Sequence, residues 1–291
     1  MTSIWRKHLI ICLFLGLLAI PIYFMDMRST TNGGGSNWIT LDFRGLIFWT
    51  YIALLVIDFG AGQVLNVDSQ NGSASVFMTV TGSSGLNALT FDSSGNVYVS
   101  DSSQGIIWKT GASGGAATAW VTDPLLLPNG IPPFGANGLA FNRAGNALFV
   151  ANTANDSIVR IPVTGGTPGA PQALVYSING ADGIVLDRND NIWVAANQSD
   201  EIVVIDPTGK VIAKLGDFDG IRKDGMPRGL FFPASPDFSK DGKNLFVTNL
   251  ALDLRLAGGP QTLQSQWADQ VKRYTISRIK ARIPDFKGQD D

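Results

Sequence analysis

Apolar and polar residues alternate in four similar stretches, which begin at Asn87, Asn137, Asp182 and Ala234. Each stretch reaches a turn rich in Asp, Asn and Gly and then alternates again, as in "NALTFDSSGNVYVSD" and "NGLAFNRAGNALFVAN". Alternation with a period of two on both sides of such a turn predicts a β-hairpin. The first positions are 50, 45 and 52 residues apart. Repeats of this length with several short strands predict the blades of a β-propeller.

A fifth repeat begins at Asn37, because "NWITLDFRG" matches "NALTFDSSG" in register and "VIDFGAGQVLNVD" matches "YVSDSSQGIIWKT". Between the two matching parts this repeat carries a longer apolar run, over residues 45–57. We interpret the run as an extended hairpin of the first blade, with a bulky core strand or a second membrane helix as alternatives. Its candidate partner-contact residues are Leu46, Ile47, Phe48, Trp49 and Tyr51.

The fold class predicted from these repeats is all-β, with a β-propeller over residues 37–279. Five repeats are visible, so five or six blades are expected. A sixth blade has only the irregular residues 251–279 to draw on, and a polar tail follows over 280–291.

A continuous apolar run from Leu9 to Met25 follows Arg6 and Lys7. Its seventeen residues would form a helix about 25 Å long, at the short end for a membrane span. Bulky residues stand where a signal peptidase needs small ones, so an uncleaved anchor over 1–28 is favoured over a cleaved signal peptide. The positive charges predict a cytoplasmic N-terminus, with membrane lipid around 9–25 and the propeller periplasmic or otherwise extracytoplasmic. Residues 29–36 predict a flexible tether.

Few residue types remain for catalysis outside this anchor. The only Cys and the only His are Cys12 and His8, so the rest of the chain excludes disulfides, Cys/His zinc sites and a His-based triad. Glu201 is the only Glu. A net charge of −2 without a basic excess argues against a nucleic-acid partner.

At "PFGANGLAFN", "GADGIVLDRNDNIWVA" and "FPASPDFSKDGKNLFVTNLAL" the chain resembles the gluconolactonase / senescence marker protein (regucalcin-like) family, over roughly residues 37–250. The resemblance implies a six-bladed propeller. It also implies a lactonase with one divalent cation on the axis, held by a Glu, an Asn and an Asp. Asn137 and Asp182 match the Asn and Asp ligands, and Asn87 matches a substrate-contacting position. No residue matches the family Glu, and Glu201 is expected on a strand away from the axis.

Equivalent positions of the repeats should converge on the central channel of a propeller. They are Asn37, Asn87, Asn137, Asp182 and Ala234. Amide and carboxylate oxygens suit a hard cation, so one Ca²⁺ or another divalent cation is the candidate cofactor, with Asn137 and Asp182 as metal ligands. Asn37 and Asn87 are candidate ligand-binding residues. The alternative is that these side chains only hydrogen-bond nearby backbone.

The missing Glu favours a non-catalytic scaffolding subunit of a larger membrane complex, with integral membrane proteins as partners. No motif identifies that complex, whether photosynthetic or respiratory. The alternatives are a metal-dependent lactonase, in which Asp182 would be the catalytic residue, and a small-molecule-binding sensor.

Overall fold

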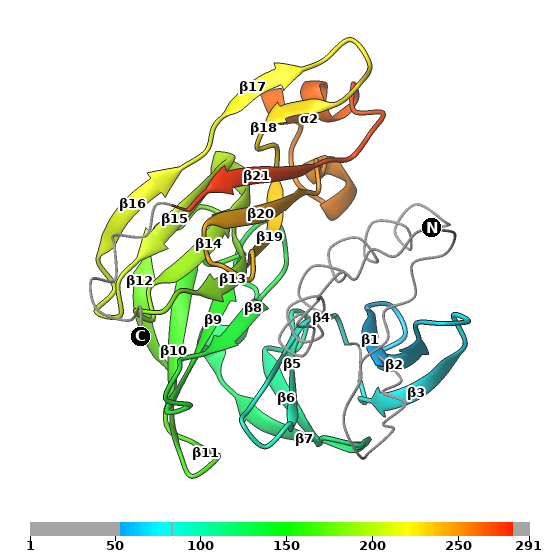
Figure 1. Cartoon of the computed structure of the whole chain (residues 1–291), viewed down its shortest axis with the longest axis vertical. Coiled ribbons are helices and arrows are strands. Elements are labelled where there is room, and N and C mark those ends of the chain that lie inside the picture. Colours follow the sequence, from blue (N-terminus) through cyan, green and yellow to red (C-terminus); the bar gives the residue numbers. More distant parts are fainter. Residues whose placement is uncertain (1–52, 83, 282–291) are drawn as a thin grey trace, which may run out of the picture.

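The computed structural model describes residues 53–82 and 84–281, and nearly all of their regular structure is β-strand (Figure 1). Several predictions fall outside these residues: the anchor at 9–25, the tether at 29–36, the ligand position Asn37 and the partner-contact residues 46–51. No helix within 53–82 or 84–281 is long and apolar enough to cross a membrane.

The strands form five groups in chain order, each mainly antiparallel. Group 1 holds β1 (Ala53–Asp58), β2 (Gln63–Asp68) and β3 (Ala74–Thr79), and group 2 holds β4 (Leu86–Phe91), β5 (Val97–Asp101), β6 (Ile106–Gly111) and β7 (Gly114–Thr122). Group 3 holds β8 (Ala136–Phe141), β9 (Ala147–Asn152) and β10 (Ser157–Thr164), with β11 (Thr167–Pro168) and β12 (Gln172–Tyr176) both paired to β10. Group 4 holds β13 (Ala181–Leu186), β14 (Ile192–Ala196), β15 (Glu201–Ile205) and β16 (Val211–Leu215). Group 5 holds β19 (Pro233–Phe238), β20 (Asn244–Asn249) and β21 (Ile276–Lys280).

Shorter elements connect or flank these groups. A short pair, β17 (Phe218–Ile221) with β18 (Pro227–Gly229), lies between groups 4 and 5 in the chain. The helical elements are η1 (Pro124–Leu126), η2 (Asn197–Ser199), η3 (Leu254–Ala257) and α2 (Leu263–Ala268). A parallel contact between β3 and β7 joins groups 1 and 2 into one sheet.

The predicted repeats are confirmed by the strand pairing. The four hairpins are β4–β5, β8–β9, β13–β14 and β19–β20. The downstream match of the fifth repeat is also confirmed, because β1 pairs with β2 as β5 pairs with β6. The strand expected from Asn37 onward lies outside the described residues.

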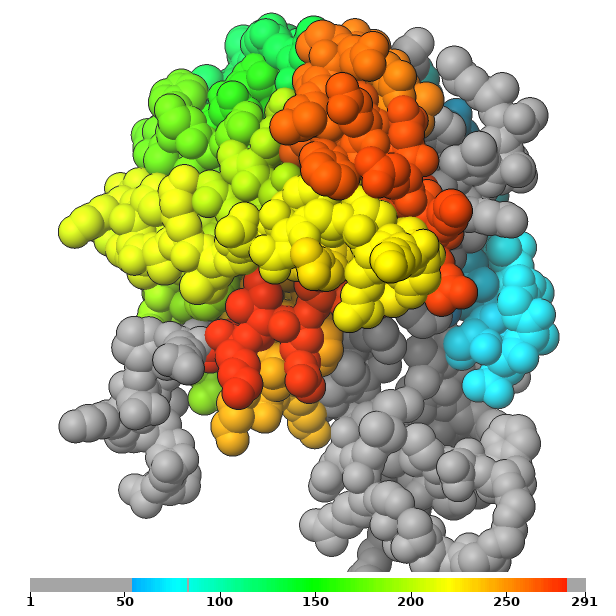
Figure 2. All heavy atoms as spheres, turned by 90° about the horizontal axis from the view of Figure 1, so that it is seen from above, coloured from blue at the N-terminus to red at the C-terminus, as the bar shows by residue number. Residues whose placement is uncertain are grey.

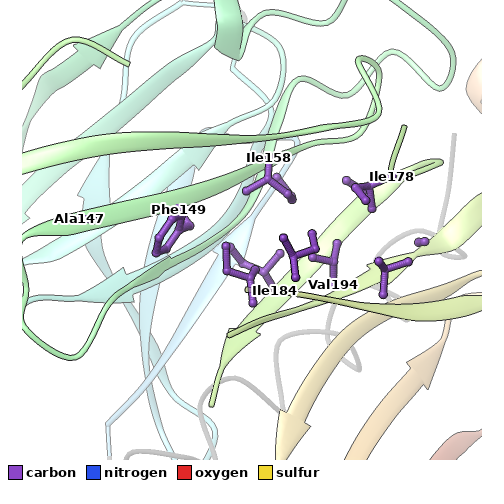
Figure 3. Close-up of a cluster of buried hydrophobic side chains, with 12 residues drawn as sticks. Ala147, Phe149, Ile158, Ile178, Ile184 and Val194 are labelled. Carbon is purple, nitrogen blue, oxygen red and sulfur yellow. The ribbon is translucent and has the colours of Figure 1, made fainter. Parts of the chain in front are cut away.

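The first strands of successive groups contact one another, β4 with β8, β8 with β13 and β13 with β19. The groups therefore follow one another in an arc around a common centre, which is a propeller-like arrangement (Figure 1). Apolar side chains fill the space between neighbouring groups. Figure 3 shows one such cluster, where Phe149 and Ile158 of group 3 face Ile184 and Val194 of group 4.

The second strand of groups 2, 3 and 4 is buried along its whole length in β5, β9 and β14. A strand covered by neighbouring sheets on both faces is mostly apolar on both faces, and its buried polar residues, such as Asp101 and Asn152, are hydrogen-bonded. This explains why "ALFVAN" and "IWVAA" alternate less clearly than the strands that precede them in each hairpin.

Candidate functional site

The first strands of groups 2 to 5 carry the same irregularity near their beginnings. The pairing of β4, β8, β13 and β19 skips two residues, between Leu86 and Leu89, Ala136 and Leu139, Ala181 and Ile184, and Pro233 and Pro236. Such a β-bulge bends the strand and re-aims the side chains within it. The first residue of each bulge is Asn87, Asn137, Asp182 or Ala234. The structural equivalence of these four predicted positions is therefore confirmed.

Two glycines show how closely the bulges approach one another. A Cβ on Gly138 would lie 2.4 Å from the carbonyl oxygen of Asp182 and 2.7 Å from Cα of Gly183. A Cβ on Gly183 would lie 2.4 Å from the carbonyl oxygen of Ala234. Backbone approach this close needs glycine. The "NG" and "DG" motifs thus bring Asn137, Asp182 and Ala234 together where groups 3, 4 and 5 meet.

The axial amides are part of a repeated hydrogen-bond relay. Nδ2 of Asn87 donates to Oγ of Ser102 (3.0 Å), which donates to the carbonyl of Ala136 (2.7 Å). One group later, Nδ2 of Asn137 donates to Oγ1 of Thr153 (2.9 Å), which donates to the carbonyl of Ala181 (2.7 Å). The amides therefore bond hydroxyl groups that link neighbouring groups, and not the nearby backbone itself. Because these bonds use Nδ2, the amide oxygens are the ligand atoms that Asn87 and Asn137 can offer.

Two amide groups contact the carboxyl group of Asp182, a residue that stays partly exposed. Nδ2 of Asn197 donates to its Oδ2 (3.2 Å), and Asn137 also hydrogen-bonds the carboxyl group. Burial raises the pKa of Asp182 to about 7, and these hydrogen bonds offset the rise only in part. The carboxyl group can therefore hold or release a proton near neutral pH. A bound cation would favour its ionised form.

Asn197 is a site residue that the sequence analysis missed. It is 2% exposed, and its Oδ1 has no hydrogen-bond partner within the described part of the chain. An orphaned buried oxygen is uncommon in proteins and is consistent with a ligand or an ordered water. The repeat register contains the signal that would have found it, because Asn197 follows β14 as Ser102 follows β5 and Thr153 follows β9.

We call Asn137, Thr153, Asp182 and Asn197 the Asp182 centre. It offers carboxylate, amide and hydroxyl oxygens, which fit a hard cation such as Ca²⁺ better than a metal that prefers sulfur or imidazole. No group of three or more His, Cys, Asp or Glu that could hold a metal ion occurs within 53–82 and 84–281. A single carboxylate therefore predicts modest affinity.

Other predicted positions do not contribute donors. Ala234 is buried and apolar. Glu201 is confirmed on a strand, at the start of β15, where its Oε1 accepts from Nζ of Lys214 (2.7 Å). Asn87 lies in the next bulge round the axis, beyond Asn137.

The raised pKa of Asp182 predicts a pH-dependent stability. An unfolded Asp releases its proton near its ordinary pKa of 3.8, whereas folded Asp182 keeps it to about 7. The stability that this proton confers is complete below pH 3.8 and falls as the pH rises to about 7. We compare the free energy of unfolding of metal-free Asp182→Asn with that of the metal-free wild type. The difference in favour of the variant should grow by on the order of 2 kcal/mol as the pH rises from 4 to 7.5. Thermal denaturation of both proteins measures this, and a difference that does not change with pH contradicts it.

The Asp182 centre lies within the part of the chain that matches a known protein family. A family model described as the SMP-30/Gluconolactonase/LRE-like region matches residues 63–216, just over half of the chain. This span contains all four residues of the Asp182 centre and Asn87. No curated protein matches the chain in sequence.

Solved structures share the fold at low identity. They include regucalcin, a calcium-binding protein from Agrobacterium tumefaciens, at 18% identity and a TM-score of 0.50, with 65% of this chain and 62% of that chain covered. A gluconolactonase from Xanthomonas campestris has 15% identity and a TM-score of 0.52, with 69% and 66% covered. A streptogramin B lyase has 16% identity and a TM-score of 0.50, with 80% and 66% covered. The chain spans slightly less than two thirds of the length of these proteins, and the likeness extends to the fold alone.

Proposed function

Because this chain belongs to the SMP-30/gluconolactonase/LRE-like family, we propose that it hydrolyses lactones at the Asp182 centre with the help of a divalent cation. The observation that carries the proposal is the partly exposed carboxyl group of Asp182, held by the amides of Asn137 and Asn197 where three strand groups meet. A carboxyl group with a pKa of about 7 can exchange a proton with water at neutral pH.

In the proposed reaction, water adds to the lactone carbonyl carbon and the ring C–O bond breaks, which yields a hydroxy acid. A divalent cation, when bound, supplies Lewis acidity toward the carbonyl oxygen and the water. Asn137 and Asp182 would hold it. Asp182 accepts the proton that the attacking water releases and returns it to the departing ring oxygen. Asn197 and Asn137 orient the carboxylate, and Asn87 is placed to contact the lactone.

The non-catalytic scaffold, which the sequence analysis favoured, finds no support in the comparisons or in the described residues. Gluconolactonase-like relatives support the lactonase alternative instead. Attachment through residues 9–25, an extracytoplasmic propeller and membrane-protein partners stay predictions, because the residues that carry them lie outside the described part. The number of blades, five or six, also stays a prediction, because the strand expected from Asn37 is not among the described residues.

A lactonase assay tests the proposed function. Chelated, purified protein is mixed with γ-butyrolactone, δ-valerolactone or glucono-δ-lactone, and ring opening is followed by proton release as Ca²⁺, Mg²⁺, Mn²⁺ or Zn²⁺ is added. We expect at least one cation to raise the rate about 100-fold or more over the chelated protein. Rates that stay at the protein-free blank with all four cations contradict the proposal.

A further inference from the structure

We call the end of the strands at which the Asp182 centre lies its entrance, and apolar side chains lie on several of the loops there. In a propeller-like fold, the loops that precede each first strand and the turns that follow each second strand meet at the same end of the strands. Backbone hydrogen bonds confirm this here. The carbonyl of Phe134, just before β8, accepts from the N–H of Ala154 (2.8 Å), next to Thr153 of the centre. The N–H of Gly135 donates to the carbonyl of Ser102 (2.8 Å).

Two aromatic rings meet on the Asn87 side of this entrance. Phe59, in the turn between β1 and β2, packs edge to face on Phe134 with ring centroids 6.1 Å apart. The ring of Phe59 also covers Gly85, two residues before Asn87, because a Cβ there would lie 3.0 Å from Cζ of Phe59. Both rings are only partly buried. They therefore offer apolar surface to a ligand that reaches the axis.

Ile131 extends the apolar surface to the Asp182 side. Its carbonyl accepts from Nε2 of Gln198 (3.4 Å), the neighbour of Asn197. Its Cγ2 lies 3.2 Å from the place of a Cβ on Gly259. Figure 2 shows the orange atoms of this later segment beside green atoms from the middle of the chain. The Ile131 side chain is 52% exposed. We call Phe59, Ile131 and Phe134 the apolar rim.

The loops of groups 1 to 4 at this end carry no positive charge, whereas the segments of group 5 hold Arg222, Lys223, Arg228, Lys272 and Arg273. Residues 59–62, 81–87, 102–105, 123–136, 153–156, 178–182 and 197–200 contain no Lys, Arg or His. Farther out, Arg255 of η3 is paired with both Asp253 and Asp269. A phosphorylated or carboxylated substrate would find no cationic side chain in the loops of groups 1 to 4, which carry the apolar side chains. The hydroxyl groups of a sugar ring on the apolar rim would lose hydrogen bonds to water and find no partners there, so the contact would not strengthen binding.

We propose that the substrate of this site is a neutral lactone with an apolar alkyl or aryl substituent, which packs on the apolar rim while its ring carbonyl reaches the Asp182 centre. The inference rests on the proposed function for the identity of the reacting group. The apolar rim selects the substituent of the lactone, and the Asp182 centre carries out the ring opening. The rim therefore distinguishes this chain's substrate from a free sugar lactone.

Lactams test the rim without relying on turnover, because they have the shape of lactones but resist hydrolysis. Calorimetry compares 2-pyrrolidinone, 5-hexyl-2-pyrrolidinone and glucono-δ-lactam. Each methylene group that the rim covers should tighten binding up to about fourfold. We expect the hexyl compound to bind at least about 30-fold more tightly than unsubstituted pyrrolidinone. It should also bind more tightly than the sugar lactam.

Two matched variants locate the effect. Ile131→Ser should weaken binding of the hexyl lactam about three- to tenfold. Ile212→Ser, in the outer strand β16, removes an isoleucine of nearly equal exposure, 50% against 52%, and should change nothing. Equal binding of the two pyrrolidinones, tighter binding of the sugar lactam, or equal losses in both variants would overturn the inference.

Failure of the proposed function gives a different result. If the hexyl lactam binds as expected but no lactone is hydrolysed, the rim stands and the lactonase proposal fails. If lactones are hydrolysed with no preference for an alkyl substituent, the lactonase proposal stands and the rim inference fails.

Discussion

Replacing Asp182 with Asn lowers kcat/KM for lactone hydrolysis by at least about 100-fold. The substitution keeps the shape of the side chain and its place in the bulge of β13, so the fold should be retained. It removes the one carboxylate of the Asp182 centre and, with it, the negative charge for a cation and the acceptor for a proton. The measurement is the steady-state rate at saturating cation, with circular dichroism as the check on folding.

Asp237→Asn is the matched control for this variant. Asp237 lies in the neighbouring strand β19, and burial raises the pKa of its carboxyl to about 6. It accepts from the backbone N–H of Phe238 (2.8 Å) rather than from the amides of the centre. Activity should survive in Asp237→Asn. An Asp182→Asn protein that folds and keeps more than about a tenth of wild-type activity would exclude Asp182 from the reaction.

Gly138→Ala should destabilise the protein by about 3 kcal/mol and lower activity with it. The added methyl group would fall 2.4 Å from the carbonyl oxygen of Asp182 and 2.7 Å from N of Ile184. Both are backbone atoms of β13, so no side chain can rotate away and groups 3 and 4 must separate. Because the displaced strand carries Asp182, the centre is distorted by the same change. Chemical denaturation measures the first effect, and the lactone assay measures the second.

Gly111→Ala provides the comparison at a glycine that has space around it. It ends β6, and a Cβ at this position meets no atom within 4 Å. Its stability should stay within about 1 kcal/mol of wild type. If Gly138→Ala is as stable as Gly111→Ala, the close approach of the bulges is not what positions the centre.

Local patterns were sufficient to predict the hairpins. Alternation and Asp/Asn/Gly turns are short-range signals, and β4–β5, β8–β9, β13–β14 and β19–β20 formed where they indicated. The equivalence of Asn87, Asn137 and Asp182 also followed from the repeat register. The raised pKa of Asp182 did not, because it depends on how much of the carboxyl group neighbouring strand groups cover.

Contacts between different strand groups could not be predicted from the sequence. Asn197 belongs to the centre because β14 ends beside β13, and Phe59 meets Phe134 across 75 positions of chain. The helical segment η3 to α2 and the pair β17–β18 interrupt the repeat, so no period could place them. The preference for a scaffold rested on an absent Glu, on the anchor at 9–25 and on the apolar run at 45–57, of which only residues 53–57 are among the described residues.

Calcium binding to the full chain tests the central claim most directly, because the lactonase proposal depends on the Asp182 centre holding a cation. Equilibrium dialysis at pH 7.5 with the wild type and Asp182→Asn gives the number of ions bound per chain. We expect one Ca²⁺ per wild-type chain at saturation, with a modest affinity in the range of about 10⁻⁴–10⁻³ M, and none in the variant. Equal binding by the two proteins, or no binding by the wild type to Ca²⁺ or any other divalent cation, would contradict the account.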